Sequence, residues 1–460
     1  MSQASLHIVI LAAGKGTRMK SSVPKVLHTL AGKAFICHVL DTVSSFNAKK
    51  ISVVVGHGAE QLKSSLSPVY PDLHYVEQTE QLGTGHAVQQ AAPDIDDQDT
   101  VVILYGDVPL VRAETIKALL QGVDQDHLSL LTICLDDPTG YGRILRDRNG
   151  QVSGIVEQKD ATEQQLGIHE VNTGLLAIHG ARLKAYLRGL RNNNKQGEYY
   201  LTDVIAMAVA DKMVVGTVNA SSEIEVAGVN DRQQQAALER AYQQRVATQL
   251  MQEGVCLTDP SRFDCRGTVT AGLDCTIDIN CIFEGEVKLG DNVQIGAHCH
   301  LRNVTIGNNT VIKPYSSLEQ SVVGQACEIG PFARLRPGTQ LADNAKIGNF
   351  VEVKNAQVGE HSKVNHLSYI GDTDLGAEVN IGAGTITCNY DGVNKHRTTI
   401  GDKVFVGSNS ALIAPVSLGE GSTIGAGSVI TQNVEANKLA LSRAPQRTIS
   451  GWQRPVKNKK

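Results

Sequence analysis

The chain has 460 residues, of which 41% are hydrophobic and 20% charged, so its composition predicts a folded globular protein of roughly three domains or two large ones. Its formal charge of −4 gives no electrostatic reason to expect a nucleic-acid partner. No apolar run is long enough to insert in a membrane, and no signal-peptide pattern opens the chain. Nine cysteines without a Cys-x-x-Cys pair argue against a disulfide framework and favour the cytoplasm.

The first 229 residues alternate short β-branched runs with helical patterns. Predicted strands occupy residues 7–11, 51–55, 100–104, 128–135 and 171–178. Predicted helices occupy residues 35–45, 83–92, 114–122 and 201–210. This alternation predicts an α/β, Rossmann-like domain, a mostly parallel sheet covered by helices on both faces. Ligands of such sheets bind at the carboxyl ends of the strands.

The string LAAGKGTRM at residues 11–19 leaves the first predicted strand through a glycine-rich turn. Gly14 and Gly16 lack a Cβ, so backbone N–H groups there can close on a polyanion that Arg18 and Lys25 neutralise. The loop has neither the P-loop spacing nor the third glycine of a dinucleotide-binding loop. A plain tight turn and a phosphate-binding loop therefore both remain open.

Two further segments could contribute to the same edge of the sheet. Asp107 follows the strand at residues 100–104, where it either caps the next helix or holds a divalent cation. Gln78 precedes a second glycine-rich loop at residues 83–86, which opens a predicted helix. That loop alone would be read as a turn with a helix cap.

Together these segments resemble the bacterial N-acetylglucosamine-1-phosphate uridyltransferases, a match that spans residues 11–25, 78–86, 105–107, 140–143, 157, 172, 198–203 and 230 in order. The resemblance implies a uridine-nucleotide site at Leu11, Ala12, Ala13, Gly14, Gln78, Gly83, Thr84, Tyr105 and Gly106. It implies that the catalytic cations Arg18 and Lys25 hold the phosphates. The implied amino-sugar ligands are Gly142, Glu157, Asn172, Tyr200 and Thr202, and the implied Mg²⁺ ligands are Asp107 and Asn230.

The implied reaction is attack of a sugar 1-phosphate oxygen on the α-phosphate of UTP, with release of pyrophosphate. Such a transfer depends on positioning and charge neutralisation more than on a protein nucleophile. The cations, the metal carboxylate and the backbone donors of these segments suit that chemistry.

Residues 230–253 separate two differently patterned regions of the chain. Leu238, Tyr242, Val246 and Leu250 recur every four residues and predict one amphipathic helix ending at Gly254. The helix is either a connector or a terminal helix packed on the first domain. As a connector, it divides the chain into domains at residues 1–229 and 254–460.

A six-residue rhythm begins after residue 265. Aliphatic or aromatic residues recur at Ile277, Phe283, Leu289, Ile295, Ile329, Leu335, Leu341, Ile347, Val353, Ile400, Val406, Leu412, Leu418, Ile424 and Ile430. This period predicts a parallel β-helix with these side chains stacked inside, and we expect a left-handed one. Cys275, Cys281, Cys299 and Cys327 take the small inward position and are predicted to fill the core. Slippage at residues 301–306 predicts a bulge or loop, and residues 387–399 predict a loop that leaves the solenoid.

A hexapeptide solenoid can serve as an oligomerising module, a regulatory appendage, a zinc-dependent carbonic anhydrase or an acyltransferase. His361 and His366 face outward, five residues apart, but a zinc site of this kind needs a third histidine. His298 and His300 lie more than three coils earlier, too far away to supply it. These spacings argue against zinc.

The segments RLRPG (residues 334–338), VEVK (351–354), HLSYIGD (366–372), VNIGAG (379–384), TCNYDG (387–392) and SR (442–443) resemble the acetyltransferase half of the same bifunctional family. The resemblance implies His366 as the general base, with Arg336 and Lys354 on the sugar phosphate and Tyr369 and Asn380 on the sugar. The implied acetyl-CoA residues are Ala383, Asn389, Tyr390, Ser408, Ala426 and Arg443. It also implies a homotrimer with sites shared between subunits.

The expected function is acetylation of glucosamine 1-phosphate by acetyl-CoA, followed by uridylylation of the N-acetylglucosamine 1-phosphate formed. Imidazole suits deprotonation of an amine near neutral pH. Direct transfer to the amine needs no covalent step, which argues against Cys388 as an acyl carrier. The main alternative keeps only the nucleotidyltransferase and makes the solenoid an oligomerising or regulatory module, and a binding scaffold without catalysis fits neither set of motifs.

Overall fold

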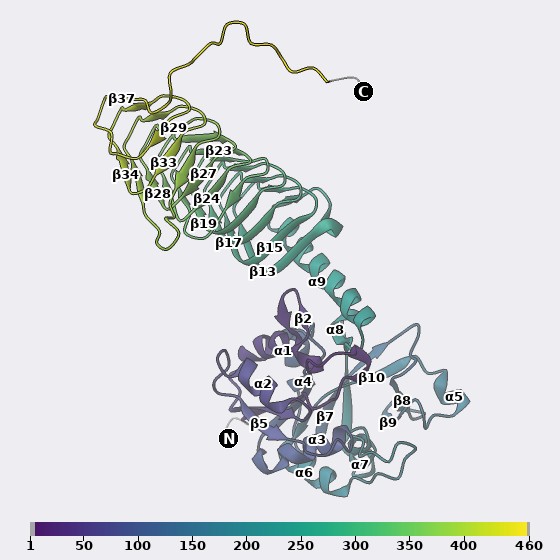
Figure 1. The fold of residues 1–460 in the computed structure, drawn as a ribbon. Helices are drawn as coiled ribbons and strands as arrows, with labels where there is room; N and C mark the ends of the chain where they lie inside the picture. The colour runs from purple at the N-terminus through teal and green to yellow at the C-terminus, as the bar shows by residue number, and fades with distance from the viewer. Residues whose placement is uncertain (1–4, 458–460) are drawn as a thin grey trace. The chain divides into compact units, whose positions relative to one another are not determined.

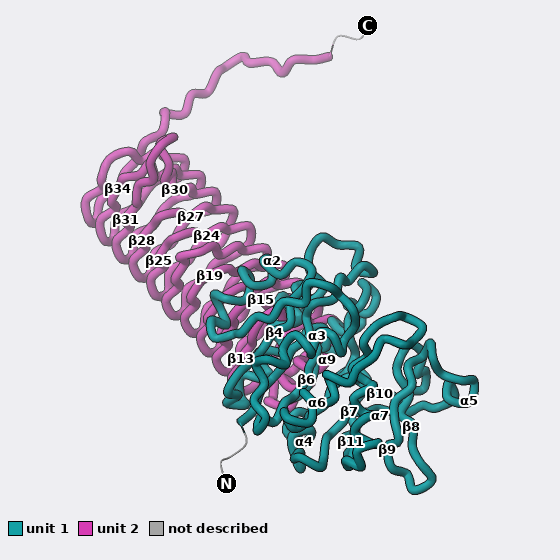
Figure 2. The backbone as a smooth tube through the Cα atoms, turned by 90° about the horizontal axis from the view of Figure 1, so that it is seen from below, with its two compact units in different colours: residues 1–242 teal, residues 243–460 magenta. Residues whose placement is uncertain are grey.

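A computed structural model describes residues 5–457 and separates into two compact units, residues 1–242 and 243–460 (Figure 2). The end of the basic tail, residues 458–460, lies outside the described residues. No helix among residues 5–457 is both long and apolar enough to span a membrane. The predicted three-part domain division stays a prediction beside this two-unit arrangement.

The first unit contains a nine-stranded sheet (Figure 1). Its main path runs β11 (Val214–Asn219), β7 (His127–Cys134), β10 (Glu170–His179), β6 (Thr100–Tyr105), β1 (Leu6–Leu11), β4 (Lys50–Val55) and β5 (His74–Glu77). The hairpin β8 (Gly142–Arg146) and β9 (Val152–Val156) joins it through β10. β10 runs antiparallel to both β6 and β7, while the β1, β4, β5 and β6 pairings are parallel. Along the main path four pairings are parallel and two are antiparallel, so this path is mostly parallel, as predicted, while the β8–β9 hairpin adds antiparallel pairings.

Alternate residues of β1 face two separate cores, as the period of a strand requires. Ile8 and Ile10 pack against α1 (Phe35–Ser44), α2 (Ala59–Leu66) and α4 (Ala113–Leu120). Val9 and Leu11 pack in the other core, which α3 (Thr84–Ala91), α6 (Gly180–Gly189) and α7 (Asp203–Ala210) cover. The prediction of helices on both faces is confirmed.

Shorter elements complete the first unit. They are the hairpin β2 (Thr29–Leu30) and β3 (Lys33–Ala34), the 3₁₀ turns η1 (Thr17–Met19), η2 (Lys25–Leu27) and η3 (Ala92–Asp94), and the short helices α5 (Glu163–Leu166) and α8 (Glu223–Val226). The predicted strands and helices all exist, with ends that differ by up to two residues.

One long helix, α9 (Arg232–Gln252), follows the sheet domain. Its first half belongs to the first unit, where Leu238 joins a small core with Met19 and Phe35. Its second half belongs to the second unit, where Ala247 and Leu250 close the start of the solenoid core.

The second unit is a left-handed parallel β-helix of hexapeptide repeats. One column of its strands contains β12 (Cys256–Leu257), β14 (Thr276–Ile277), β16 (Gln294–Ile295), β18 (Val311–Ile312), β20 (Glu328–Ile329), β23 (Lys346–Asn349), β26 (Lys363–His366), β29 (Asn380–Ile381), β32 (Phe405–Val406), β35 (Thr423–Ile424) and β37 (Leu439–Ala440). Each pairs in parallel with the strand of the next coil.

The remaining strands begin as long ones that bend across two faces, after the 3₁₀ turn η4 (Pro260–Arg262). They are β13 (Phe263–Ala271), β15 (Cys281–Leu289), β17 (His300–Ile306) and β19 (Ser317–Val323). After β19 they separate into two columns. One holds β21 (Arg334–Leu335), β24 (Glu352–Lys354), β27 (Tyr369–Gly371), β30 (Ile386–Cys388), β33 (Ala411–Ile413) and β36 (Val429–Ile430), and the other holds β22 (Gln340–Leu341), β25 (Gln357–Val358), β28 (Thr373–Leu375), β31 (Thr398–Ile400) and β34 (Val416–Leu418).

The hexapeptide interpretation of the interior is confirmed. The fifteen repeating positions are all buried, and so are the four predicted core cysteines. Burial raises the pKa of the Cys299 thiol to about 12, so it stays protonated and behaves as an apolar side chain.

The bulge predicted at residues 301–306 lies instead in the neighbouring strand. β17 is continuous through this stretch, and the register shifts in β15 between Glu284 and Val287. β15 carries one extra residue there, with Gly285 in a left-handed conformation. The loop predicted at residues 387–399 lies between β30 and β31 and projects from the solenoid (Figure 1).

One corner of the solenoid carries a stack of aromatic rings on its outside. The ring centroids of His298, Tyr315, Phe332 and Phe350 follow one another at 4.8, 4.9 and 5.2 Å. Leu367 takes the same corner in the next coil, where its N–H donates to Asn349 O. All five residues have positive φ, a conformation that bulky side chains rarely adopt.

Candidate active sites

A cavity of about 380 Å³ opens where β1 ends. It is lined by Leu11, Ala12, Ala13, Gly14, Lys25, Val26, Gln78, Gln81, Gly83, Thr84, Ala87, Tyr105, Asp107, Glu198 and Asn230. Ten predicted nucleotide or metal residues and Lys25 thus surround one space at the carboxyl edge of the sheet. Gly14 meets no atom where a Cβ would stand, so its backbone is open to a ligand.

The second glycine-rich loop is held close to the chain at Tyr199. Gly83 has φ 110°, and a Cβ there would lie 2.6 Å from Tyr199 O. Gln78 is buried, and its Nε2 donates to Gly83 O at 3.1 Å. Only glycine fits at position 83, and Gln78 fixes the loop at the start of α3.

Asp107 caps no helix, because α4 begins at Ala113. Lys25 Nζ instead donates to Asp107 Oδ2 and, at 3.2 Å, to Asn230 Oδ1. A backbone bond from Val229 N to Asp107 O at 3.0 Å holds the two segments together. A carboxylate and an amide oxygen therefore converge on one cation, which is the oxygen donor set that Mg²⁺ prefers.

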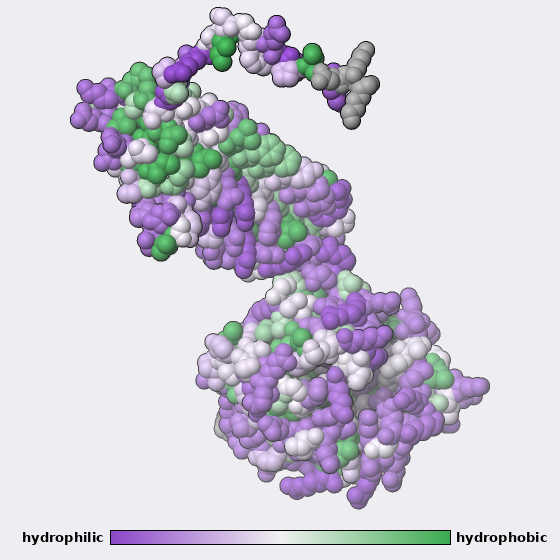
Figure 3. All heavy atoms as spheres, viewed as in Figure 1, coloured by the Kyte–Doolittle hydropathy of each residue, from purple (hydrophilic) through white to green (hydrophobic). Residues whose placement is uncertain are grey.

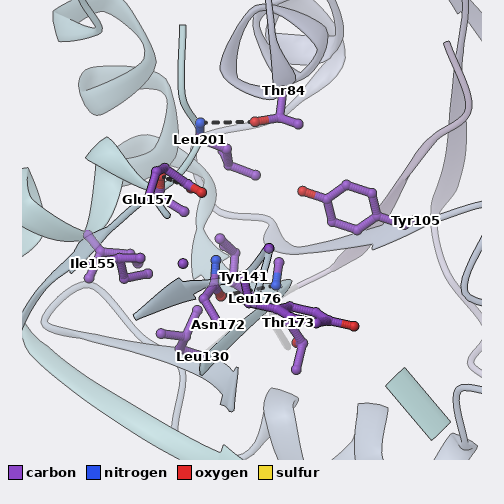
Figure 4. Close-up of a pocket in the computed structure, with 15 residues that line it drawn as sticks. Thr84, Tyr105, Leu130, Tyr141, Ile155, Glu157, Asn172, Thr173, Leu176 and Leu201 are labelled. Carbon is purple, nitrogen blue, oxygen red and sulfur yellow. Dashed lines mark hydrogen bonds between the residues drawn. The ribbon is translucent and has the colours of Figure 1, made fainter. Parts of the chain in front are cut away.

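A second cavity, of about 260 Å³, adjoins Thr84 and Tyr105 (Figure 4). Its walls include Gly142, Glu157, Asn172 and Thr202, four of the five predicted sugar residues. Thr202 Oγ1 donates to Glu157 Oε1 at 2.9 Å. Burial raises the pKa of Glu157, so its ionised form is held at a cost that a hydroxyl-bearing ligand could offset.

Three predicted residues of the α/β unit, Tyr200, Gly106 and Arg18, line neither of these two cavities. Tyr200 lines a third cavity of about 310 Å³, which shares Glu157 and Thr202 with the second. The Gly106 N–H donates to Leu11 O at 3.0 Å and supports the loop from behind. Arg18 lies in the 3₁₀ turn η1 with an exposed side chain and lines none of the three cavities.

The solenoid presents His366 at the corner that the aromatic stack approaches. His366 Nδ1 lies 3.0 Å from Asn349 Oδ1, one coil earlier. The predicted acetyl-CoA residues Ala383, Ser408 and Ala426 continue this corner. Backbone bonds join Gly384 N to His366 O, Asn409 N to Ala383 O, and Gly427 N to Ser408 O. Arg443 Nη1 donates to Ala426 O at 2.5 Å, at the end of this row of residues along the corner.

A positive cluster lies on the adjoining face. Arg336 Nη1 donates to Glu352 Oε1 at 2.8 Å. Lys354 stands next to Lys395, and this like-charged neighbour is the main reason that the pKa of Lys354 is lowered. Neighbouring ammonium groups attract a phosphate dianion, which would relieve their repulsion.

The projecting loop is anchored beside this cluster. Asn389 Nδ2 donates to Asp372, whose carboxylate also accepts from Asn355. Tyr390 lies at the start of the loop with its hydroxyl on Gly392 O at 2.5 Å and its ring exposed. Tyr369 lies on β27, over Gly371, whereas Asn380 lies on β29 across the corner.

Sequence reasoning missed several residues of these sites. Gln81 and Glu198 lie inside segments that carried the resemblance, but the sequence did not show that these two residues line the cavity. Asn349 and Lys395 come from outside those segments. The solenoid register, with residues one coil apart side by side, is the signal that could have found Asn349. Burial raises the pKa of the Cys388 thiol, which disfavours the thiolate that an acyl carrier would need.

The fold and its two separate sites define a two-part transferase, with a nucleotidyltransferase-like α/β unit and a hexapeptide acyltransferase-like solenoid. Family models agree: the MobA-like NTP transferase domain matches residues 8–168, the GMPPB C-terminal domain residues 265–369, and the hexapeptide repeat of succinyl-transferase residues 397–432.

Curated relatives match almost the whole chain. "Bifunctional protein GlmU" of Marinobacter nauticus is 56% identical over 98% of this chain and 99% of its own. The protein of that name in Cellvibrio japonicus is 57% identical over the same shares, and that of Ralstonia nicotianae is 54% identical over 99% and 100%. The chain belongs to the bifunctional GlmU family.

Proposed function

We propose that each unit carries out one of two successive reactions. The chain is a bifunctional enzyme that makes UDP-N-acetylglucosamine. The solenoid transfers acetyl from acetyl-CoA to glucosamine 1-phosphate, and the α/β unit then joins N-acetylglucosamine 1-phosphate to UTP and releases pyrophosphate. The observation that carries this proposal is the presence of two separately built sites, each with the residue types that its reaction needs. Residues 1–229 and 254–460 form the two catalytic domains and residues 230–253 connect them.

In the α/β unit, the cavity at the end of β1 holds the nucleotide. Ala12, Ala13 and Gly14 offer backbone to the base and phosphates, while Gln78 and Thr84 border the same space. Lys25, and Arg18 from its exposed turn, neutralise the triphosphate. The reaction places a phosphate oxygen of the sugar 1-phosphate opposite the departing pyrophosphate, so alignment and charge neutralisation provide the rate.

Asp107 and Asn230 are the proposed Mg²⁺ ligands. Their side-chain oxygens already share one cation, the ammonium of Lys25. When bound, Mg²⁺ neutralises phosphate oxygens and orients the triphosphate. Lys25 is then free to contact a phosphate itself, because its present partners would be engaged.

The cavity that Glu157 and Thr202 line holds the N-acetylated sugar. Glu157 accepts hydrogen bonds from sugar hydroxyls. Asn172 on β10 and the backbone of Gly142 on β8 line the same cavity. Tyr200 encloses the sugar from the adjoining cavity. Thr84 and Tyr105 line both this cavity and the nucleotide cavity, which would bring the two substrates together.

In the solenoid, His366 removes the proton from the amine as it attacks the thioester carbonyl of acetyl-CoA. A neutral imidazole that donates its Nδ1–H to Asn349 Oδ1 leaves the Nε2 lone pair free to accept that proton. Arg336 and Lys354 bind the phosphate, and Tyr369 and Asn380 orient the sugar on either side of the corner. Ala383, Ser408, Ala426 and Arg443, with Asn389 and Tyr390 of the loop, hold acetyl-CoA along the row.

The assembly that we propose is a homotrimer. His366 and its row lie on an outer corner, where one solenoid offers only a shallow surface and a neighbour would complete a cleft. Exposed apolar rings support this: Phe332 and Phe350 are 46% and 56% exposed. Hydrophobic surface is also plain on the solenoid in Figure 3. Nine free cysteines support a reducing, cytoplasmic setting.

The test is incubation of the protein with glucosamine 1-phosphate, acetyl-CoA, UTP and Mg²⁺, with free CoA thiol and pyrophosphate measured separately. Both products should form, and omission of acetyl-CoA should suppress pyrophosphate until N-acetylglucosamine 1-phosphate is supplied. Pyrophosphate without any thiol would reduce the solenoid to an oligomerising or regulatory module.

A further inference from the structure

Arg143 is a buried cation that makes no close ion pair among the described residues, although Asp137 interacts with it electrostatically at longer range. It lies in β8 and is only 2% exposed. No ion pair within 4.0 Å reaches its guanidinium from the described residues. Burial of an unpaired charge is costly, so the hydrogen bonds that this guanidinium makes need a reason.

Those hydrogen bonds join the segment that leads into β8 to the segment that follows β9. Nη1 donates to Tyr141 O, just before β8. Nη2 donates at 2.8 Å to Oε1 of Gln158, which follows β9. The same Gln158 oxygen accepts from Gly140 N at 3.2 Å. Gly140, Tyr141 and Gln158 are therefore joined through one guanidinium.

The guanidinium acts from the side of the hairpin that faces away from the second cavity. Arg143 pairs with Val156 across the hairpin, so these side chains share one face. Gly142, Ile155 and Glu157 belong to the other face, and they line the cavity. Arg143 itself does not line it and would not touch the sugar.

The hairpin ends that Arg143 joins are walls of that cavity. Gly140, Tyr141 and Gly142 line it on one side and Glu157, next to Gln158, lines it on another. Gly140 has φ 92° and meets no atom where a Cβ would stand, so little else confines it. Without the guanidinium, the turn and Glu157 would lose their common anchor.

We propose that Arg143, with Gln158, is a positioning device for the sugar cavity: it sets the distance between the turn at residues 140–142 and the Glu157 carboxylate. It is a specificity element for the amino-sugar phosphate and has no role in UTP binding. The inference rests on the proposed function of the cavity that Glu157 lines.

The test compares Arg143→Met with wild type. Met fills similar space and removes the cost of burying a charge, which offsets the hydrogen bonds that Tyr141 O and Gln158 Oε1 lose. The melting temperature should therefore change little. The KM for N-acetylglucosamine 1-phosphate should rise about tenfold to hundredfold, the worth of a hydrogen bond to a charged group, while the KM for UTP and the acetyl transfer stay within about twofold.

A second variant guards against a fold defect. Gln158→Met removes the shared acceptor and should raise the same KM, whereas Gln158→Glu keeps an acceptor oxygen and should leave it near wild type. Arg146→Met is the matched control, because Arg146 lies on the same strand but pairs with Glu170 on the surface. It should leave both KM values unchanged.

Three results would each overturn a different part of the inference. If Glu157→Gln and Asn172→Ala raise the sugar KM but Arg143→Met and Gln158→Met do not, the positioning role is wrong and the cavity assignment stands. If none of the four changes the sugar KM, the cavity is not the sugar site. A parallel rise in the KM for UTP in Arg143→Met would mark Arg143 as a general structural residue and overturn its role in sugar specificity.

Discussion

Glu157→Gln tests two consequences of burying this carboxylate beside a ligand, namely its contribution to sugar binding and its cost to the stability of the fold. The change removes the charge but keeps an oxygen that can accept from Thr202 Oγ1, now 2.9 Å from Glu157 Oε1. Loss of a charged acceptor for a sugar hydroxyl costs about 1.5–3 kcal/mol, so the KM for N-acetylglucosamine 1-phosphate should rise about tenfold to hundredfold. The KM for UTP should not change.

The same substitution should stabilise the α/β unit at neutral pH. Burial raises the pKa of Glu157 above its ordinary value, so ionisation above that raised pKa costs folding free energy. The glutamine variant escapes this cost. Its advantage should be full above the raised pKa and vanish below the ordinary carboxyl range, where Glu157 is protonated in both the folded and the unfolded chain.

Steady-state kinetics with pyrophosphate detection and thermal unfolding at several pH values measure both effects. Glu163→Gln is the control, because Glu163 is exposed on α5 and should show neither effect. An unchanged sugar KM would refute the cavity assignment. Equal or lower stability of Glu157→Gln at neutral pH would refute the burial argument.

Two predictions concern the solenoid. Asn349→Asp should move the acidic limb of the acetyl-transfer pH profile to higher pH, because a carboxylate next to His366 favours the protonated imidazole. The control is Asn365→Asp, since Asn365 is one residue from His366 and makes no side-chain hydrogen bond to it. If the limb does not move in Asn349→Asp, the contact between Asn349 and His366 is ruled out. Co-expression of His366→Ala with Arg443→Ala subunits should restore part of the acetyl transfer in a species about three times the chain mass, whereas no recovery in that species would place both residues in one subunit's site.

The solenoid was predictable because its six-residue period is local and repeats many times. Ile277 or Val406 can be assigned to the interior from neighbours alone. The α/β unit was predictable at the level of strands and helices, since β1 and β6 are plain apolar runs.

The sites were predictable mainly where resemblance supplied them. Gly142, Glu157 and Asn172 lie together because β10 is inserted antiparallel and the β8–β9 hairpin pairs beside it. No local sequence pattern predicts that pairing. Lys395 reaches Lys354 only through the path of a loop. Asn230 looks like part of the α9 start until the fold brings it to Lys25.

The most direct test of the central claim, two independent reactions in one chain, is a paired measurement on Asp107→Ala and His366→Ala. Free CoA thiol and pyrophosphate are followed in each, with N-acetylglucosamine 1-phosphate supplied for the second reaction. His366→Ala should lose acetyl transfer by roughly 10²–10⁴, the usual worth of a positioned base, and keep uridylyl transfer. Asp107→Ala should lose pyrophosphate formation and keep CoA release near wild type. Loss of both activities in either variant, or full acetyl transfer by His366→Ala, would contradict the claim.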